Sequence, residues 1–237
     1  MKNILFITTM YPTPEWSLDT PVCHYFTKEW IKMGYNVRVI HYQSIFPIIF
    51  YWILAVFPRI SARFIGNDKN NRFRRRKTLY YNIDGVSVES IPIFKFIPHG
   101  KYDRITISKQ IRRIVNRNQS DAFSPNLIVG HFHNPQLEII AKLRNIYPKA
   151  ITCIVLHEEA SSIRKTYPKH HSQYMENIDV WGFRYLSLRD EFANTYGNNF
   201  DSFITHSGIP DKYITHTNRK FENGVKKYCY VGQLIAL

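Results

Sequence analysis

The sequence predicts an α/β protein with an open parallel sheet and helices on both of its faces. Two observations lead to this prediction. Short, continuously apolar segments that are typical of central parallel strands alternate with segments whose apolar residues recur at helical spacing. No internal repeat interrupts this alternation. Strand, helix and strand in succession form a βαβ unit, in which parallel strands are joined by a right-handed crossover.

The first βαβ unit is predicted at the N-terminus. Residues 3–8 form a short apolar strand, and a helix follows with Thr20 as its N-cap and Pro21 as its first residue. Gly34 is placed to end this helix before a second strand at residues 37–42. Four apolar residues of the helix share one face by their spacing, and we expect that face to be buried: Val22, Phe26, Trp30 and Met33.

The alternation continues along the rest of the chain. Residues 80–93 predict one or two strands with a turn at Asp84-Gly85, and residues 105–116 predict a helix. A second helix begins at Pro135 with Asn134 as its cap. The remaining elements are predicted strands at 126–132, 150–156, 180–186 and 201–206, and a helix at 188–196 that Gly197 ends.

Cysteine content and the N-terminus indicate a cytoplasmic protein. The three cysteines, Cys23, Cys153 and Cys229, are odd in number, far apart and without a CxxC pair, so neither a disulfide framework nor a zinc site is expected. The apolar run near the N-terminus is only four residues long, which is too short for a signal peptide. We therefore expect a reducing compartment.

A charge-free apolar segment is followed directly by a basic cluster. Residues 43–58 contain no charged side chain, whereas residues 59–77 carry eight Lys or Arg against one Asp, which is half of the net charge of +14. The apolar segment is too short to cross a membrane, because a transmembrane helix needs about 20 apolar residues. Apolar residues beside cations are typical of an anchor that lies in the membrane plane, since apolar burial and attraction to anionic head groups then add.

We therefore predict peripheral binding to an anionic membrane, at the inner face, and we assign the contact to Phe50, Trp52, Phe57, Arg72, Arg74, Arg75, Arg76 and Lys77. The alternative is a buried helix followed by a solvated basic loop. Nucleic-acid binding is a second alternative, supported by the charge and by sixteen tyrosines. Only Phe73 interrupts the basic run and no recognition module is visible, so nucleic acid is not expected as a partner.

Polar side chains gather where the predicted strands end. Ligands of an open parallel sheet bind beyond the carboxyl ends of its strands. His157 follows the strand at 150–156 directly, so we expect it at that edge, with Glu158 or Glu159 raising its pKa and fixing its orientation. The other candidate substrate-binding residues at strand ends are Thr9, Tyr11, His131, His133, Glu158, Glu159, Ser207 and Gly208.

Spacing excludes several other chemistries. The ten glycines never fall closer than eight residues apart, so no Gly-rich phosphate loop is present. His131 and His133 could face the same way at a strand end, but they lack the i, i+4 spacing of a helical zinc site, and no metal is expected. Ser207-Gly208 lacks the preceding glycine of a nucleophile elbow, which argues against a serine hydrolase.

The order of several short segments resembles the N-terminal, acceptor-side domain of family 4 glycosyltransferases of the GT-B fold. The first strand and its proline-containing loop are similar to that domain, as are Met33-Gly34 before a Val-rich strand and the strand that ends in His157. The remaining segments of similar sequence are 183–187, 205–210 and the YVGQL of residues 230–234. Thr20-Pro21-Val22-Cys23 stands where many members carry paired glycines close to the donor phosphates.

The resemblance implies a Rossmann-like acceptor-binding domain at residues 1–214, the N-terminal half of a GT-B enzyme. Residues 215–237 would be a linker and the first strand of a C-terminal donor-binding domain that is missing. The histidine of the family contacts the donor sugar, which implies a catalytic role for His157. The full reaction would transfer a sugar, with retention, from a nucleotide-sugar to a polysaccharide or a lipid-linked glycan.

This half is expected to bind the glycan or lipid-linked acceptor and to bind no cofactor of its own. The nucleotide-sugar donor is expected for the full enzyme, because the E-x7-E element of the family lies in the missing domain. Alone, the chain should therefore have little or no transferase activity. A peripheral membrane scaffold without chemistry remains the alternative from another functional class.

Overall fold

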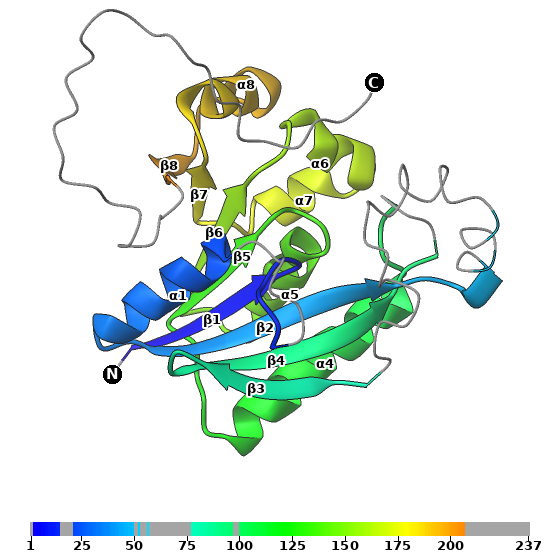
Figure 1. Cartoon of the computed structure of the whole chain (residues 1–237). Helices are drawn as coiled ribbons and strands as arrows, with labels where there is room; N and C mark the ends of the chain where they lie inside the picture. Colours follow the sequence, from blue (N-terminus) through cyan, green and yellow to red (C-terminus); the bar gives the residue numbers. More distant parts are fainter. Residues whose placement is uncertain are drawn as a thin grey trace, which may run out of the picture.

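The computed structural model of the chain describes residues 2–14, 21–49, 52, 56, 77–96 and 100–206. These residues form an open eight-stranded sheet in the order β3-β4-β2-β1-β5-β6-β7-β8, with helices on both faces (Figure 1). Neighbouring strands are parallel except β3, which runs antiparallel to β4 at one edge. The predicted α/β class is confirmed, and the Rossmann-like sheet is consistent with one half of a GT-B protein.

The elements have the following bounds. The strands are β1 (Asn3–Thr8), β2 (Asn36–Ile45), β3 (Leu79–Ile83), β4 (Val86–Phe94), β5 (Leu127–His131), β6 (Ile151–Leu156), β7 (Val180–Phe183) and β8 (Asp201–Ile204). The helices are α1 (Val22–Lys32), α4 (Arg104–Ser120), α5 (Gln136–Ile146), α6 (Ser161–Thr166), α7 (His171–Met175) and α8 (Leu186–Tyr196).

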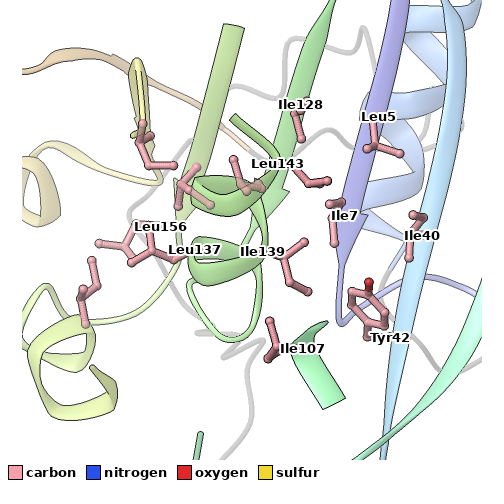
Figure 2. Close-up of a cluster of buried hydrophobic side chains, with 14 of the residues drawn as sticks. Leu5, Ile7, Ile40, Tyr42, Ile107, Ile128, Leu137, Ile139, Leu143 and Leu156 are labelled. Atoms are coloured by element: carbon pink, nitrogen blue, oxygen red, sulfur yellow. The ribbon is translucent and has the colours of Figure 1, made fainter. Parts of the chain in front are cut away.

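Side chains of the strands point alternately to the two faces of the sheet and build a separate apolar cluster on each. Leu5 and Ile7 of β1 belong to the larger cluster, which α4 and α5 cover, and Figure 2 shows Ile139 of α5 facing Ile7. Ile4 and Phe6 of the same strand point to the other face, where they join Cys23 of α1. The central strands are therefore buried on both sides, which explains their continuous hydrophobicity.

The first helix differs from its prediction. It begins at Val22 with Pro21 in the N-cap position, and no side chain caps it. Its buried residues are Cys23, His24 and Thr27, whereas Met33 is 69% exposed, so the predicted face was wrong in part. Hydrogen bonds explain the orientation, because the hydroxyl of the buried Tyr11 lies 2.9 Å from Nδ1 of His24 and 2.7 Å from Oγ1 of Thr27.

The hairpin of β3 and β4 confirms the predicted Asp84-Gly85 turn. Both residues have positive φ, 51° and 83°, as a tight two-residue hairpin turn requires. The Asp84 carboxylate also contacts α1, accepting a hydrogen bond from Lys28 Nζ at 2.8 Å and lying 3.1 Å from His24 Nε2. The turn is thereby fixed to the helix of the first βαβ unit.

Several boundaries depart from the sequence prediction. The predicted strand at 180–186 ends at Phe183, and Leu186 instead begins α8. The Asn134 side chain does not cap α5, because its Nδ2 donates to the carbonyl of Gly100 at 3.0 Å. Helices α6 and α7 were not predicted, since five or six residues are too short to show helical periodicity.

Within the described residues, no helix is both long enough and apolar enough to pass through a membrane. The predicted linker at 215–237, its YVGQL strand and most of the segment 46–77 lie outside the described residues.

Candidate functional site

The strand order places a topological switch point between β1 and β5. From β1 the chain builds the sheet outward through β2 and β4, and it then returns to place β5 on the other side of β1. The two following crossovers therefore leave in opposite directions, and ligands of open α/β sheets bind beyond the carboxyl ends of the strands at such a point. Thr8 and His131 are the last residues of these two strands.

Side chains from β1, α1, β5 and the end of β6 meet at this point. Nδ1 of His131 lies 3.0 Å from Nε2 of His157, which follows β6 directly. The same Nδ1 lies 3.6 Å from the Sγ of Cys23 in the first turn of α1, and that sulfur lies 3.6 Å from Oγ1 of Thr8. We call His131, His157, Cys23 and Thr8 the switch-point cluster. His157 is therefore at the carboxyl edge of the sheet, as predicted, and is only partly buried.

Burial keeps the switch-point cluster uncharged at neutral pH. Desolvation, reinforced by the positive charge of Arg184, lowers the pKa of His157 to about 4. The pKa of His131, which is only 2% exposed, is lowered well below its usual value by burial and then by the charges of His157 and Arg184. Burial also raises the pKa of the Cys23 thiol to about 11. Both imidazoles are thus neutral hydrogen-bonding groups rather than cations.

The expected effect of the neighbouring carboxylates on His157 was wrong. Glu158 does not raise its pKa, because the Glu158 carboxylate lies beside His133, with Oε2 3.3 Å from Nδ1. Glu159 is exposed and accepts a hydrogen bond from the Ser161 hydroxyl at 3.3 Å. The orientation of His157 comes instead from His131 and from Phe132, whose ring stacks on the imidazole with centroids 4.3 Å apart.

His131 and His133 do not face the same environment. Strand β5 ends at His131, and Phe132 has a φ of 72°, a left-handed conformation that is unfavourable for a bulky residue. This turn directs His133 to α6, where its Nε2 lies 2.9 Å from Oγ1 of Thr166. His133 is 3% exposed, and burial together with Lys95 lowers its pKa to about 4. Its contacts fix α6 to the end of β5.

The other predicted substrate-binding residues are placed as follows. Tyr11 is fully buried and holds α1, as described above, so its hydroxyl is not open to a ligand. Thr9 is partly exposed next to the buried Thr8. Ser207 and Gly208 lie outside the described residues.

Sequence reasoning missed two cations at the same edge. Arg184 directly follows β7, and its charge reaches Cys23, His131 and His157. It was overlooked because the strand was predicted to continue to residue 186. Lys95 directly follows β4, with its Nζ 4.9 Å from the centre of the Tyr102 ring, and its charge reaches His133 and Glu158. Asking which residues follow the predicted strands at 80–93 would have found Lys95, whereas Arg184 required the correct end of β7.

Two of the predicted membrane-contact residues are described, Trp52 and Lys77, and both are exposed. Trp52 is 74% exposed, and Ile48, Ile49 and Val56 near it in sequence are between 54% and 69% exposed. Phe50, Phe57, Arg72, Arg74, Arg75 and Arg76 lie outside the described residues. The alternative of a buried helix does not hold for the part of this segment that is described.

The described side chains show no group of three or more His, Cys, Asp or Glu arranged to hold a metal ion. The switch-point cluster supports hydrogen bonding by neutral imidazoles within reach of the Arg184 charge. A neutral imidazole can orient a hydroxyl group, and the Arg184 charge favours a negative group near it.

Comparisons with known proteins identify no family for this chain. No protein-family model and no curated protein matches this chain. Solved structures of similar fold include the N-terminal domain of trehalose-6-phosphate phosphatase from Candida albicans, with 13% identity and a TM-score of 0.47 over 88% of this chain and 49% of that one. The likeness at such identity concerns the fold alone.

Two further solved structures are synthases. The UDP-forming α,α-trehalose-phosphate synthase from Burkholderia xenovorans, determined with glucose-6-phosphate, has 9% identity and a TM-score of 0.49 over 87% of this chain and 50% of that one. The α,α-trehalose 6-phosphate synthase from Burkholderia multivorans has 12% identity and a TM-score of 0.48 over 82% and 43%. This chain spans about half the length of the solved structures that it matches.

Proposed function

We propose that this α/β domain is the acceptor-binding domain of a retaining glycosyltransferase, and that a second domain binds the nucleotide-sugar donor. One observation carries the proposal. His131 and His157, two neutral imidazoles in contact, lie at the carboxyl edge of a Rossmann-like sheet, beside its switch point and within reach of the Arg184 charge. The acceptor would be a polysaccharide or a lipid-linked glycan.

The role of each residue follows from its surroundings. His157 is the partly exposed member of the imidazole pair, so its free ring atoms can meet a sugar hydroxyl. His131 is buried behind it and holds its orientation. Arg184 would supply one positive charge on this side of the cleft, where the negative charge of a leaving diphosphate must be stabilised. Fixing the acceptor in this way lowers the entropic part of the activation barrier to sugar transfer.

The proposal is tested with the 237-residue chain and ligand-observed NMR. A panel of oligosaccharides and nucleotide-sugars is added, and saturation transfer from protein to ligand is recorded. We expect oligosaccharides to respond and the response to fall in His157→Ala, while Met33→Ala, a change at the exposed residue just after α1, has no effect. Tight binding of a nucleotide-sugar by this chain would place the donor site here and overturn the division of roles.

A second candidate function is a peripheral membrane scaffold without chemistry. The exposure of Ile48, Ile49, Trp52 and Val56, which lie close together in the sequence, favours it, because exposed apolar side chains that gather on a surface mark interaction sites. The same NMR panel separates the two candidates. Binding to anionic vesicles together with no response from any saccharide would favour the scaffold.

A further inference from the structure

Exposed apolar side chains gather at one part of the carboxyl edge of the sheet. Strands β2 and β4 are parallel neighbours with Ile45 opposite Phe94, so the residues that follow them leave the sheet side by side. Ile48 and Ile49 follow β2 and are 54% and 65% exposed, and Phe96 follows β4 and is 57% exposed. We call Ile48, Ile49, Phe96 and Ile105 the apolar edge.

Ile105 belongs to this edge because of how α4 is anchored. It lies in the first turn of α4 and is 69% exposed. The Tyr102 hydroxyl, just before the helix, lies 2.6 Å from Oγ of Ser44 near the end of β2. The start of α4 is thereby tied to the strand that leads to Ile48.

Exposed cations stand beside the elements that carry the apolar edge. Lys77, Lys101 and Arg104 are exposed next to β3 and at the start of α4. Single exposed apolar side chains are common on soluble proteins, but several of them bordered by cations fit the interface of an anionic membrane. Each such cation contributes about 1 kcal/mol near an anionic lipid surface. The charge of the edge thus selects a lipid surface rather than a neutral partner.

The apolar edge and the switch-point cluster share a boundary, and Lys95 occupies it. The Lys95 backbone N–H donates to the Ile45 carbonyl at 2.9 Å, which continues the pairing of β4 with β2. Its ammonium lies over the Tyr102 ring, and its charge reaches Glu158 and His133, which flank His157 and His131 in sequence. The bond from Asn134 to Gly100 also connects the segment after β5 to the segment before α4.

The surroundings of Lys95 call for an anionic ligand. The Lys95 ammonium is partly buried over the Tyr102 ring, and the half-exposed Glu158 is the carboxylate whose charge reaches it. Burial lowers its pKa. Taking a cation out of water is costly unless a negative group compensates it. A phosphate at the boundary would compensate the charge and would leave the adjoining apolar edge free for a hydrocarbon chain.

We infer that the acceptor is an anionic amphiphile presented by a membrane, with its hydrocarbon chain along the apolar edge, its phosphate at Lys95 and its reacting hydroxyl at His157. The inference rests on the proposed function and narrows its acceptor to a lipid-linked one. It makes the membrane surface the route by which the substrate enters the site.

The test uses dodecyl phosphate below its micelle concentration and isothermal titration calorimetry with the 237-residue chain. Dodecyltrimethylammonium has the same chain with the opposite charge, and inorganic phosphate has the head group without the chain. We expect dodecyl phosphate to bind about ten-fold more tightly than either. Equal binding of inorganic phosphate would indicate a soluble phosphate ligand, and equal binding of the cationic amphiphile would indicate unspecific apolar contact. Either result overturns the inference.

Variants locate the binding site. Lys95→Gln and the double variant Ile48→Ser/Ile49→Ser should each weaken dodecyl phosphate about ten-fold, while Lys95→Arg restores most of the affinity. Two variants serve as matched controls: Lys109→Gln, at an exposed lysine elsewhere on α4, and Met33→Ser, just after α1. Each should change the affinity for dodecyl phosphate less than about two-fold. Melting curves confirm that each variant is folded. Unchanged affinity in a folded Lys95→Gln protein would refute the placement of the phosphate.

The failure of this inference differs from the failure of the proposed function. A saccharide response that depends on His157, with no binding of dodecyl phosphate, would retain the glycosyltransferase proposal and reject the amphiphile. Binding of dodecyl phosphate that depends on Lys95, with no saccharide response, would reject the transferase role and leave a lipid-binding edge.

Discussion

Nε2 of His157 lies 3.0 Å from Nδ1 of His131, and this contact joins the ends of β6 and β5. One proton occupies the contact, because burial keeps both rings neutral at pH 7. His131 is also beside the Cys23 thiol, so the orientation of His157 depends on residues of three separate elements. A change at any of them is expected to alter the partly exposed imidazole at the site.

Replacing His157 by Ala should lower sugar transfer about ten-fold or more, the scale of one lost contact of roughly 1.4 kcal/mol in the transition state. The measurement is turnover of a radiolabelled nucleotide-sugar by a protein in which this chain accompanies a donor-binding domain. Gln119→Ala, at an exposed position near the end of α4, is the control and should retain full activity. Equal turnover by the His157→Ala protein would remove His157 from the site.

Stability should fall on mild acidification. His133 and His157 have pKa values of about 4 when folded and near 6.5 when unfolded, so the unfolded chain binds protons more tightly between these values. The contribution of these histidines to the free energy of unfolding is therefore complete above pH 6.5, and it is lost as the pH decreases toward 4. We expect the Tm to fall by about 5 °C or more between pH 7 and pH 5.

A double variant isolates the contribution of these two histidines. Asp84 and Asp103 have pKa values below 3.8, so both remain ionised throughout this interval. Between pH 7 and pH 5, the Tm of the protein with His133→Gln and His157→Gln should decrease by less than about half of the decrease seen for the parent. An equal loss in both proteins would show that other groups cause the pH dependence.

Trp52→Ser should weaken binding to anionic vesicles about ten-fold or more, since the exposed indole would lose its apolar contact with the lipid. Met33→Ser removes an apolar side chain of similar exposure just after α1 and should have no effect on vesicle binding.

Replacing Arg74, Arg75 and Arg76 by Gln should weaken vesicle binding several-fold, and added salt should reduce that difference. Cosedimentation with vesicles at low salt provides the measurement, and identical sedimentation of all proteins would argue against a membrane surface here.

Gly130→Ala should destabilise the fold by about 1 to 3 kcal/mol because of overpacking. A Cβ at this position of β5 would lie 2.9 Å from Cβ of Gln136, an atom that cannot move away without the backbone of α5. It would also lie 2.7 Å from Cδ1 of Ile140 and 2.8 Å from Cδ1 of Ile154. Thermal unfolding should show a Tm lower by about 2 to 4 °C for each kcal/mol. Ser108→Ala, on the exposed side of α4, should leave the Tm nearly unchanged. An unaltered Tm in Gly130→Ala would mean that α5 can move away from the sheet at low cost.

The sequence by itself determined the elements whose signals are local. Strand β1 has the predicted bounds of residues 3–8, and the Asp84-Gly85 turn joins β3 to β4. His157 was placed at the end of β6 because the first polar residue after a buried apolar strand must lie where that strand leaves the sheet. These features depend on neighbours in the chain, and the sequence contains all the information about those neighbours.

The tertiary structure decided which side chains meet. The pairing of His131 with His157, 26 residues apart, depends on β5 and β6 being neighbours, and the separation of His133 depends on the left-handed Phe132. Hydrogen bonds from Tyr11 set the buried face of α1. Burial lowered the pKa values of His133 and His157. For His157 this effect was opposite to the increase in pKa that was expected from nearby carboxylates. Hydrogen bonds over long sequence separations and desolvation act only once the chain is folded, so composition and spacing could not reveal them.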